Sequence, residues 1–199
     1  QLAANVFERI KYRPGLVFVY SQIGTCYVSL GKYDIATQYH TKALSIYTFR
    51  ELLDSLEVYR QSETELDEHQ KRLISVLSIA YHDFGWNCEL MGFYEKAIDL
   101  YKKSYQLGKA LKRKDRTGAA LSDIANVYFV LGNLEEAERY FLKAIDELES
   151  ANHLNYLAVT CNNLSNLYIK LKKIDIAKRY ANKSFEYFQA TGDSASMVY

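Results

Sequence analysis

IANVYFVLGNLEEAERYFLKA, residues 124–144, is the stretch that decides the fold of this chain. Its pattern returns forty residues later as LSNLYIKLKKIDIAKRYANKS, residues 164–184. Each copy carries apolar residues at helical spacing, a break after Leu131 or Leu171, and then a second helical stretch. A period of about 20 to 50 residues is typical of stacked repeats, because one such unit cannot bury its apolar face alone. The sequence therefore predicts an all-α fold of antiparallel helix hairpins.

An alanine in every copy sets the predicted repeat boundaries. Ala36, Ala97 and Ala137 each stand five residues after a glycine, and Ala177 stands five residues after Lys172, which occupies the same turn position. Aligned on these alanines, the predicted repeats are 17–50, 78–111, 118–151 and 158–191.

The segments around these repeats are also assigned from the sequence. Forty residues separate the last three alanines, so we expect a longer second helix or a longer following turn, in segments 108–116 and 149–156. Residues 51–77 are predicted to form an extended helix and a loop, and residues 1–11 the trailing helix of a preceding repeat. We expect about nine helices in one domain, residues 1–199, that is an excerpt of a longer chain.

Composition and charge narrow the classes of partner. The formal net charge is +1 with acids and bases interspersed, so the chain lacks the basic field that concentrates nucleic acid or an anionic membrane surface. No apolar run approaches the roughly 18 to 20 residues of a membrane-spanning helix. Cys26, Cys88 and Cys161 lie far apart in helical segments, which favours reduced packing residues over a disulfide or zinc site. We therefore expect a cytoplasmic protein that has no cofactor. We also expect that this region binds neither nucleic acid nor membrane.

The pattern resembles the tetratricopeptide repeat over most of the chain. In that family a small residue at the eighth position lets the paired helices approach, and an aromatic residue at the eleventh position wedges between them. Alanines at the twentieth and twenty-seventh positions relieve crowding against the next unit. In order of repeats these roles fall to Gly24, Tyr27, Ala36 and Ala43; Gly85, Cys88, Ala97 and Ser104; Ala125, Tyr128, Ala137 and Ala144; Ser165, Tyr168, Ala177 and Ser184. The resemblance implies a right-handed α-solenoid, a superhelix of stacked hairpins.

In such a solenoid the first helix of every hairpin lines the concave side, which is the expected ligand site. Asn126, Asn162 and Asn166 each offer a donor and an acceptor that match an extended peptide backbone. Trp86, together with two phenylalanines, offers an apolar anchor. A competing interpretation is that Asn126, Asn163 and Asn166 stand at repeat positions where asparagine is simply common in the family. The predicted peptide-binding residues are Phe18, Thr25, His82, Trp86, Glu89, Ser122, Asn126, Phe129, Asn162 and Asn166.

The charges on the predicted face favour one kind of ligand. A clamp for a C-terminal carboxylate, as in chaperone-binding members of the family, would need Lys or Arg at the inner positions, and none stands there. Asp83, Glu89 and Asp123 are the local charges, so we expect a neutral or mildly basic ligand.

We expect no enzyme. His82 precedes Asp83, but adjacent residues on a helix point about 100° apart, so these two side chains are not expected to converge. His82 and Glu89 are two turns apart and would leave a metal with too few ligands. No phosphate-binding glycine loop, nucleophile elbow or paired-cysteine metal motif appears.

The extended repeats and amide-bearing groove resemble those of bacterial peptide-pheromone receptors and of repeat regions attached to signalling regulators. This resemblance implies a non-catalytic module that binds a peptide or protein segment, as the sensory or scaffolding region of a bacterial regulator. Two alternatives stay open. One is part of a peptide-regulated phosphatase, whose activity would need an N-terminal helical bundle. The other is an architectural module that forms a homo-oligomer.

Overall fold

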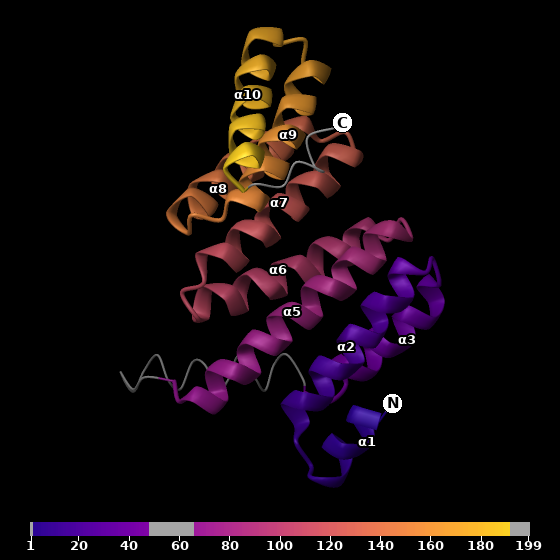
Figure 1. The fold of residues 1–199 in the computed structure, drawn as a ribbon. Coiled ribbons are helices and arrows are strands. Elements are labelled where there is room, and N and C mark those ends of the chain that lie inside the picture. Colours follow the sequence, from indigo (N-terminus) through magenta and orange to yellow (C-terminus); the bar gives the residue numbers. More distant parts are fainter. Residues whose placement is uncertain (1, 48–65, 192–199) are drawn as a thin grey trace. The chain divides into compact units, whose positions relative to one another are not determined.

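The computed structural model describes residues 2–47 and 66–191, and every regular element in these ranges is an α-helix (Figure 1). The chain divides into two compact units, residues 1–112 (unit 1) and 113–199 (unit 2). The described helices of unit 1 are α1 (Leu2–Arg9), α2 (Arg13–Ser29), α3 (Tyr33–Leu44), α5 (Glu68–Leu90) and α6 (Tyr94–Ala110). Those of unit 2 are α7 (Lys114–Val130), α8 (Leu134–Ser150), α9 (Leu154–Lys170) and α10 (Ile174–Thr191).

Consecutive helices pack as hairpins within each unit. In unit 1 the hairpins are α2–α3 and α5–α6, and α5 packs on both helices of the first hairpin. In unit 2 the hairpins are α7–α8 and α9–α10, and α9 packs on α8 and on α7. The predicted all-α fold of helix hairpins is confirmed, with nine helices in the described residues. The assignment of all 199 residues to a single domain stays a prediction.

The repeat of forty residues arises from lengthening both helices of a hairpin. Helices α6 to α9 each contain 17 residues, and the turns that join them, 111–113, 131–133 and 151–153, have three residues each. The first helices of the last two repeats begin at Lys114 and Leu154, ahead of the predicted starts at 118 and 158. The extra residues of each repeat were expected in its second helix or in the following turn. They also lie in the first helix of the next repeat.

The second repeat begins earlier than its alanine suggested. Helix α5 starts at Glu68, not near Ser78, because Asp67 forms a capping box with Gln70. The Asp67 carboxylate accepts from the Gln70 backbone N–H at 2.8 Å, and the Gln70 side chain accepts from the Asp67 N–H at 2.8 Å. Residues 68–77, the end of the segment predicted as an extended helix and a loop, are thus helical. Most of the predicted 51–77 segment, residues 51–65, lies outside the described residues.

The alanine and glycine positions of the repeat carry the packing roles expected of them. Ala36, Ala97 and Ala137 are fully buried, and Ala177 is 3% exposed. A Cβ at Gly85 would lie 2.7 Å from the Tyr101 ring in the partner helix of its hairpin. The small residues therefore allow close approach of the paired helices.

Tyrosine pairs join the two helices of three hairpins. The residue at the eleventh position of the repeat stacks on a tyrosine of the second helix, with ring centroids 5.5 to 5.6 Å apart. These pairs are Tyr27–Tyr39, Tyr128–Tyr140 and Tyr168–Tyr180. The aromatic wedge expected at this position is confirmed in these hairpins, while Cys88 fills it in the second.

The turn inside each hairpin places its middle residue in the left-handed region. The φ angles are 68° at Gly31, 79° at Gly92, 78° at Gly132 and 59° at Lys172. After Gly132, the N–H of Asn133 returns to the carbonyl of Tyr128 at 2.9 Å, which satisfies a free carbonyl at the helix end. Glycine adopts this conformation without strain, whereas a residue with a Cβ is strained in it.

We expect Lys172→Gly to raise the free energy of unfolding by about 1 kcal/mol, since it removes the Cβ strain of the left-handed conformation. The matched reverse change, Gly132→Ala, should lower it by about 1 kcal/mol although open space surrounds that position. Urea denaturation followed by circular dichroism measures both changes. Equal stability of the wild type and Lys172→Gly would contradict the assignment of strain to this turn.

Candidate functional site

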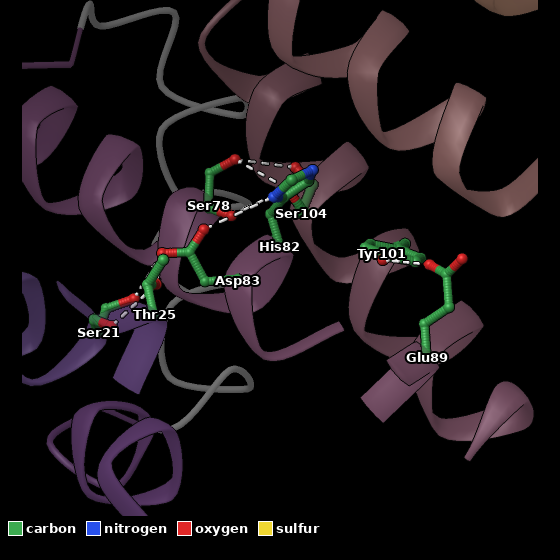
Figure 2. Close-up of polar contacts among 8 residues, drawn as sticks. All are labelled: Ser21, Thr25, Ser78, His82, Asp83, Glu89, Tyr101 and Ser104. Atoms are coloured by element: carbon green, nitrogen blue, oxygen red, sulfur yellow. Dashed lines mark hydrogen bonds and ion pairs between the residues drawn. The ribbon is translucent and has the colours of Figure 1, made fainter. Parts of the chain in front are cut away.

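The first helices of the two hairpins in unit 1 are joined by a carboxylate. Asp83 of α5 accepts hydrogen bonds on Oδ2 from Ser21 Oγ at 2.9 Å and from Thr25 Oγ1 at 3.1 Å, both on α2. Figure 2 shows the Asp83 side chain reaching toward these two hydroxyls. Ser21 is buried, while Thr25 and Asp83 are partly exposed. A polar junction thus lies at the face shared by α2 and α5.

His82 lies closer to Asp83 than the helical angle suggested. Its Nδ1 is 3.7 Å from Asp83 Oδ1, so the expectation that these neighbouring side chains do not converge is wrong. The distance is too long for a hydrogen bond. The His82 ring also packs against the Tyr101 ring, with centroids 5.6 Å apart. Flexible χ angles bring the two groups together where Cβ directions alone would separate them.

Glu89 is engaged within its own hairpin. Its Oε2 accepts a hydrogen bond from the Tyr101 hydroxyl at 2.7 Å, and the side chain is partly exposed (Figure 2). By contrast, Phe18 of α2 is 46% exposed and Trp86 of α5 is 38% exposed. The α2/α5 face, defined here by Phe18, Thr25, His82, Asp83 and Trp86, therefore combines open aromatic surface with a carboxylate and a hydroxyl.

In unit 2 the corresponding helices α7 and α9 are joined by neutral polar groups. Ser122 is only 2% exposed, and its hydroxyl bonds the Thr160 hydroxyl at 2.9 Å. The Asn163 side-chain N–H₂ donates to Asn126 Oδ1 at 2.9 Å. The hydroxyl of Ser122 is therefore used between the helices, whereas Asn126 keeps its N–H₂ group for other partners.

Two further amides of α9 lie open. Asn162 and Asn166 are exposed, and within the residues that the structure describes neither side chain has a hydrogen-bond partner. Phe129 of α7 is partly exposed, and the Lys170 ammonium lies 5.1 Å from its ring centroid. The α7/α9 face, defined by Asn126, Phe129, Asn162 and Asn166, thus presents amides beside an aromatic ring.

The structure places Asp83 and Asn163, which are not among the predicted peptide-binding residues, at the junctions between hairpins. Both stand fourteen residues before the alanine of their repeat, and each bonds the residue eleven before the alanine of the preceding repeat, Thr25 or Asn126. The signal was present in the sequence as a polar residue at one repeat position. Its role depends on how adjacent hairpins stack, which the pattern within one repeat does not contain.

The described residues hold no cluster of metal-ligating side chains, and their two buried cysteines are not reactive. In ranges 2–47 and 66–191 no group of three or more His, Cys, Asp or Glu side chains is arranged to hold a metal ion. Burial raises the pKa of the Cys161 thiol to about 11 and also raises the pKa of Cys88, so neither is a reactive thiolate near neutral pH. Within the same ranges, every helix is too short or too polar to cross a bilayer.

The sequence of this chain is similar to a known repeat family and to a known regulatory protein. Family models described as tetratricopeptide repeat match residues 19–48 and 116–190, together more than half of the chain. The chain is also similar to the regulatory protein RapF of Bacillus subtilis (strain 168), with 30% identity over 149 residues. The aligned region is 75% of this chain and 39% of RapF, so the chain spans about two fifths of that relative.

Solved structures resemble the fold. The crystal structure of aspartyl phosphate phosphatase F from Bacillus subtilis matches with a TM-score of 0.72 and 24% identity, over 92% of this chain and 42% of that chain. A Rap protein complexed with competence and sporulation factor matches with a TM-score of 0.55 and 18% identity, over 90% of this chain and 56% of that chain. At these identities the likeness concerns the fold.

Proposed function

The chain belongs to the tetratricopeptide repeat family, and on that premise we propose that it is a non-catalytic region of a bacterial regulatory protein that binds a peptide or protein segment. The relatives support this proposal. RapF is named a regulatory protein, and a related structure contains a Rap protein in complex with competence and sporulation factor. A cytoplasmic setting, supported by three free cysteines, is part of the proposal.

The observation that carries the proposal is the set of available amides on the α7/α9 face. Asn162 and Asn166 are exposed and lack hydrogen-bond partners among the described residues, and Asn126 retains its N–H₂ group. A carboxamide bonds both the N–H and the C=O of an extended backbone. Each such bond contributes about 0.5 to 1.5 kcal/mol, so several are needed for useful affinity.

The α2/α5 face contributes different chemistry. Phe18 and Trp86 expose aromatic surface of the kind that dominates binding energy at interfaces. Asp83 adds a negative charge that no described Lys or Arg side chain neutralises through an ion pair. This face therefore favours a neutral or mildly basic ligand over an acidic one.

Alanine substitutions test the proposal on peptides selected by display against the full chain. We expect Asn166→Ala or Asn126→Ala to raise the Kd of peptides bound at the α7/α9 face by about three- to tenfold, the loss of one or two hydrogen bonds. For peptides bound at the α2/α5 face, Trp86→Ala should raise the Kd by at least about tenfold. Fluorescence anisotropy with labelled peptides measures these constants.

Asn182→Ala is the matched control, because Asn182 is exposed on α10, outside both faces. It should leave the Kd unchanged. If the Kd of every selected peptide stayed unchanged in the Asn126, Asn166 and Trp86 variants, the assignment of these faces would be refuted.

A second candidate is part of a peptide-regulated phosphatase, which the structural likeness to aspartyl phosphate phosphatase F favours. Incubating the chain with a protein phosphorylated on aspartate, and following loss of the phosphoryl group, separates the two candidates. We expect no acceleration by this chain alone. An architectural role is tested by light scattering across a concentration series, where a monomer at every concentration would count against it.

A further inference from the structure

The single hydrogen of the Thr25 hydroxyl is already committed. Thr25 Oγ1 is 3.1 Å from Asp83 Oδ2 and 3.1 Å from the Ser21 carbonyl oxygen, and both of these atoms only accept. A hydroxyl has one hydrogen and two lone pairs. The charged carboxylate is the stronger acceptor of the two, so it takes the hydrogen and Thr25 has no donor left for a ligand.

Asp83 also holds the hydrogen of the Ser21 hydroxyl. The Ser21 hydroxyl donates to Asp83 Oδ2 at 2.9 Å and is buried, so it completes the junction without reaching the surface. The other oxygen of the carboxylate, Oδ1, lies 3.7 Å from His82 Nδ1 and is also an acceptor. The polar atoms that this junction offers to a ligand, Thr25 Oγ1 and Asp83 Oδ1, are therefore both acceptors.

Unit 2 provides an internal comparison at the same repeat positions. There Asn163 replaces the carboxylate and donates to Asn126 Oδ1 at 2.9 Å. The group left for a ligand is then the N–H₂ of Asn126, a donor. The residue fourteen before the repeat alanine is thus a carboxylate, which only accepts, beside Thr25 and a carboxamide, which both donates and accepts, beside Asn126.

We propose that Asp83 is a positioning residue that makes the α2/α5 face selective for a ligand group with an N–H donor, such as a peptide backbone amide, by holding the hydroxyl hydrogens of Ser21 and Thr25. This inference rests on the proposed function and names the kind of ligand group that the α2/α5 face binds. An ester in place of the matching amide presents only acceptors there and is disfavoured.

An ester scan tests the selectivity. The probe is a display-selected peptide whose binding depends on Trp86, prepared in versions that each carry one backbone ester in place of an amide. With the wild type we expect one ester to raise the Kd by about tenfold. Thr25→Val, which keeps the shape and removes the hydroxyl, should raise the Kd of the amide peptide by a similar factor. With this variant the ester and amide peptides should bind with nearly equal Kd.

Asp83→Asn is the decisive variant, since its amide can donate to the hydroxyls and release their hydrogens toward the ligand. The penalty of the same ester should shrink to about threefold or less. Ser29→Ala, which removes another α2 hydroxyl outside the junction, should leave the penalty at its wild-type value. An ester penalty unchanged by Thr25→Val and by Asp83→Asn would overturn the inference and leave peptide binding intact.

A measurement on the free chain keeps the test independent of any peptide. The hydroxyl proton of Ser21 should be visible by NMR because its hydrogen bond to Asp83 slows exchange with water, and Asp83→Ala should accelerate that exchange by at least about tenfold. Exchange at the same rate in both proteins would overturn the inference. Failure to select any peptide, with the proton protected as expected, would instead refute the proposed function.

Discussion

Acidification from pH 7 to about pH 4 is expected to lower the free energy of unfolding of this chain by about 3 kcal/mol through His40 alone. The His40 side chain is fully buried in unit 1, stacked on the Phe84 ring with centroids 5.5 Å apart. Neither ring nitrogen has a hydrogen-bond partner. The site therefore holds a neutral imidazole and offers no hydrogen bond to its charged form.

The direction of the effect follows from the pKa of His40. Burial lowers it from 6.5 to about 4, and the nearby Asp83 carboxylate opposes the shift without cancelling it. The unfolded chain takes up the proton near pH 6.5, whereas the folded chain resists until about pH 4. The full contribution is thus present above pH 6.5 and is lost as the pH falls toward 4.

His40→Phe is the informative variant, because Phe141 occupies the same repeat position in unit 2 and is also fully buried. Its stability at pH 7 should equal or exceed that of the wild type, since two unpaired buried nitrogens are removed. Between pH 7 and 4 it should lose about 3 kcal/mol less than the wild type. Urea denaturation at several pH values measures the difference.

The control is His69→Gln, which removes an exposed histidine of α5. The pH dependence of this variant should match the wild type. Parallel pH profiles for the wild type and His40→Phe would show that His40 does not couple protons to folding.

Gly85→Ala is expected to lower the free energy of unfolding by about 2 kcal/mol, although alanine is the better helix former. The added Cβ would lie 2.7 Å from two atoms of the Tyr101 ring. That ring is 1% exposed and its hydroxyl donates to Glu89 at 2.7 Å, so it has no room to move away. The helices of the second hairpin would have to separate.

A double-mutant cycle isolates this contact. Tyr101→Ala alone should cost about 3 to 5 kcal/mol because it leaves a cavity. In that background Gly85→Ala should be neutral or stabilising, which gives a coupling of about 2 kcal/mol. Thermal and urea unfolding of the four proteins supply the values. If Gly85→Ala lowered the free energy of unfolding equally in both backgrounds, the destabilisation would not arise from contact with the Tyr101 ring.

The helical hairpins were predictable because their signals are local. Apolar spacing identified the helices, and Gly31, Gly92 and Gly132 marked turns that the structure forms with positive φ angles. Element boundaries were less accurate. The Asp67 capping box starts α5 ten residues before the aligned start at Ser78, because a helix continues past its repeat register wherever a cap permits.

The location of the candidate site stays a prediction, and the exposure of its residues could be predicted only in part. Asn162, Asn166, Trp86 and Phe18 are exposed as a binding role requires. Ser122 is buried, since its hydroxyl pairs with Thr160 on the neighbouring hairpin. Helical periodicity gives the face on which a residue stands but not which other helix covers that face.

The sequence by itself determined the repeat, the hairpins and the composition of the two faces, since each depends on residues within one forty-residue unit. Only the tertiary structure decided which polar groups remain for a ligand. Asp83 meets Ser21 and Thr25 across 62 and 58 residues, and Asn163 meets Asn126 across 37. These contacts arise where one hairpin stacks on another, and the physical reason is that hydrogen-bond polarity depends on the partner atom across that junction.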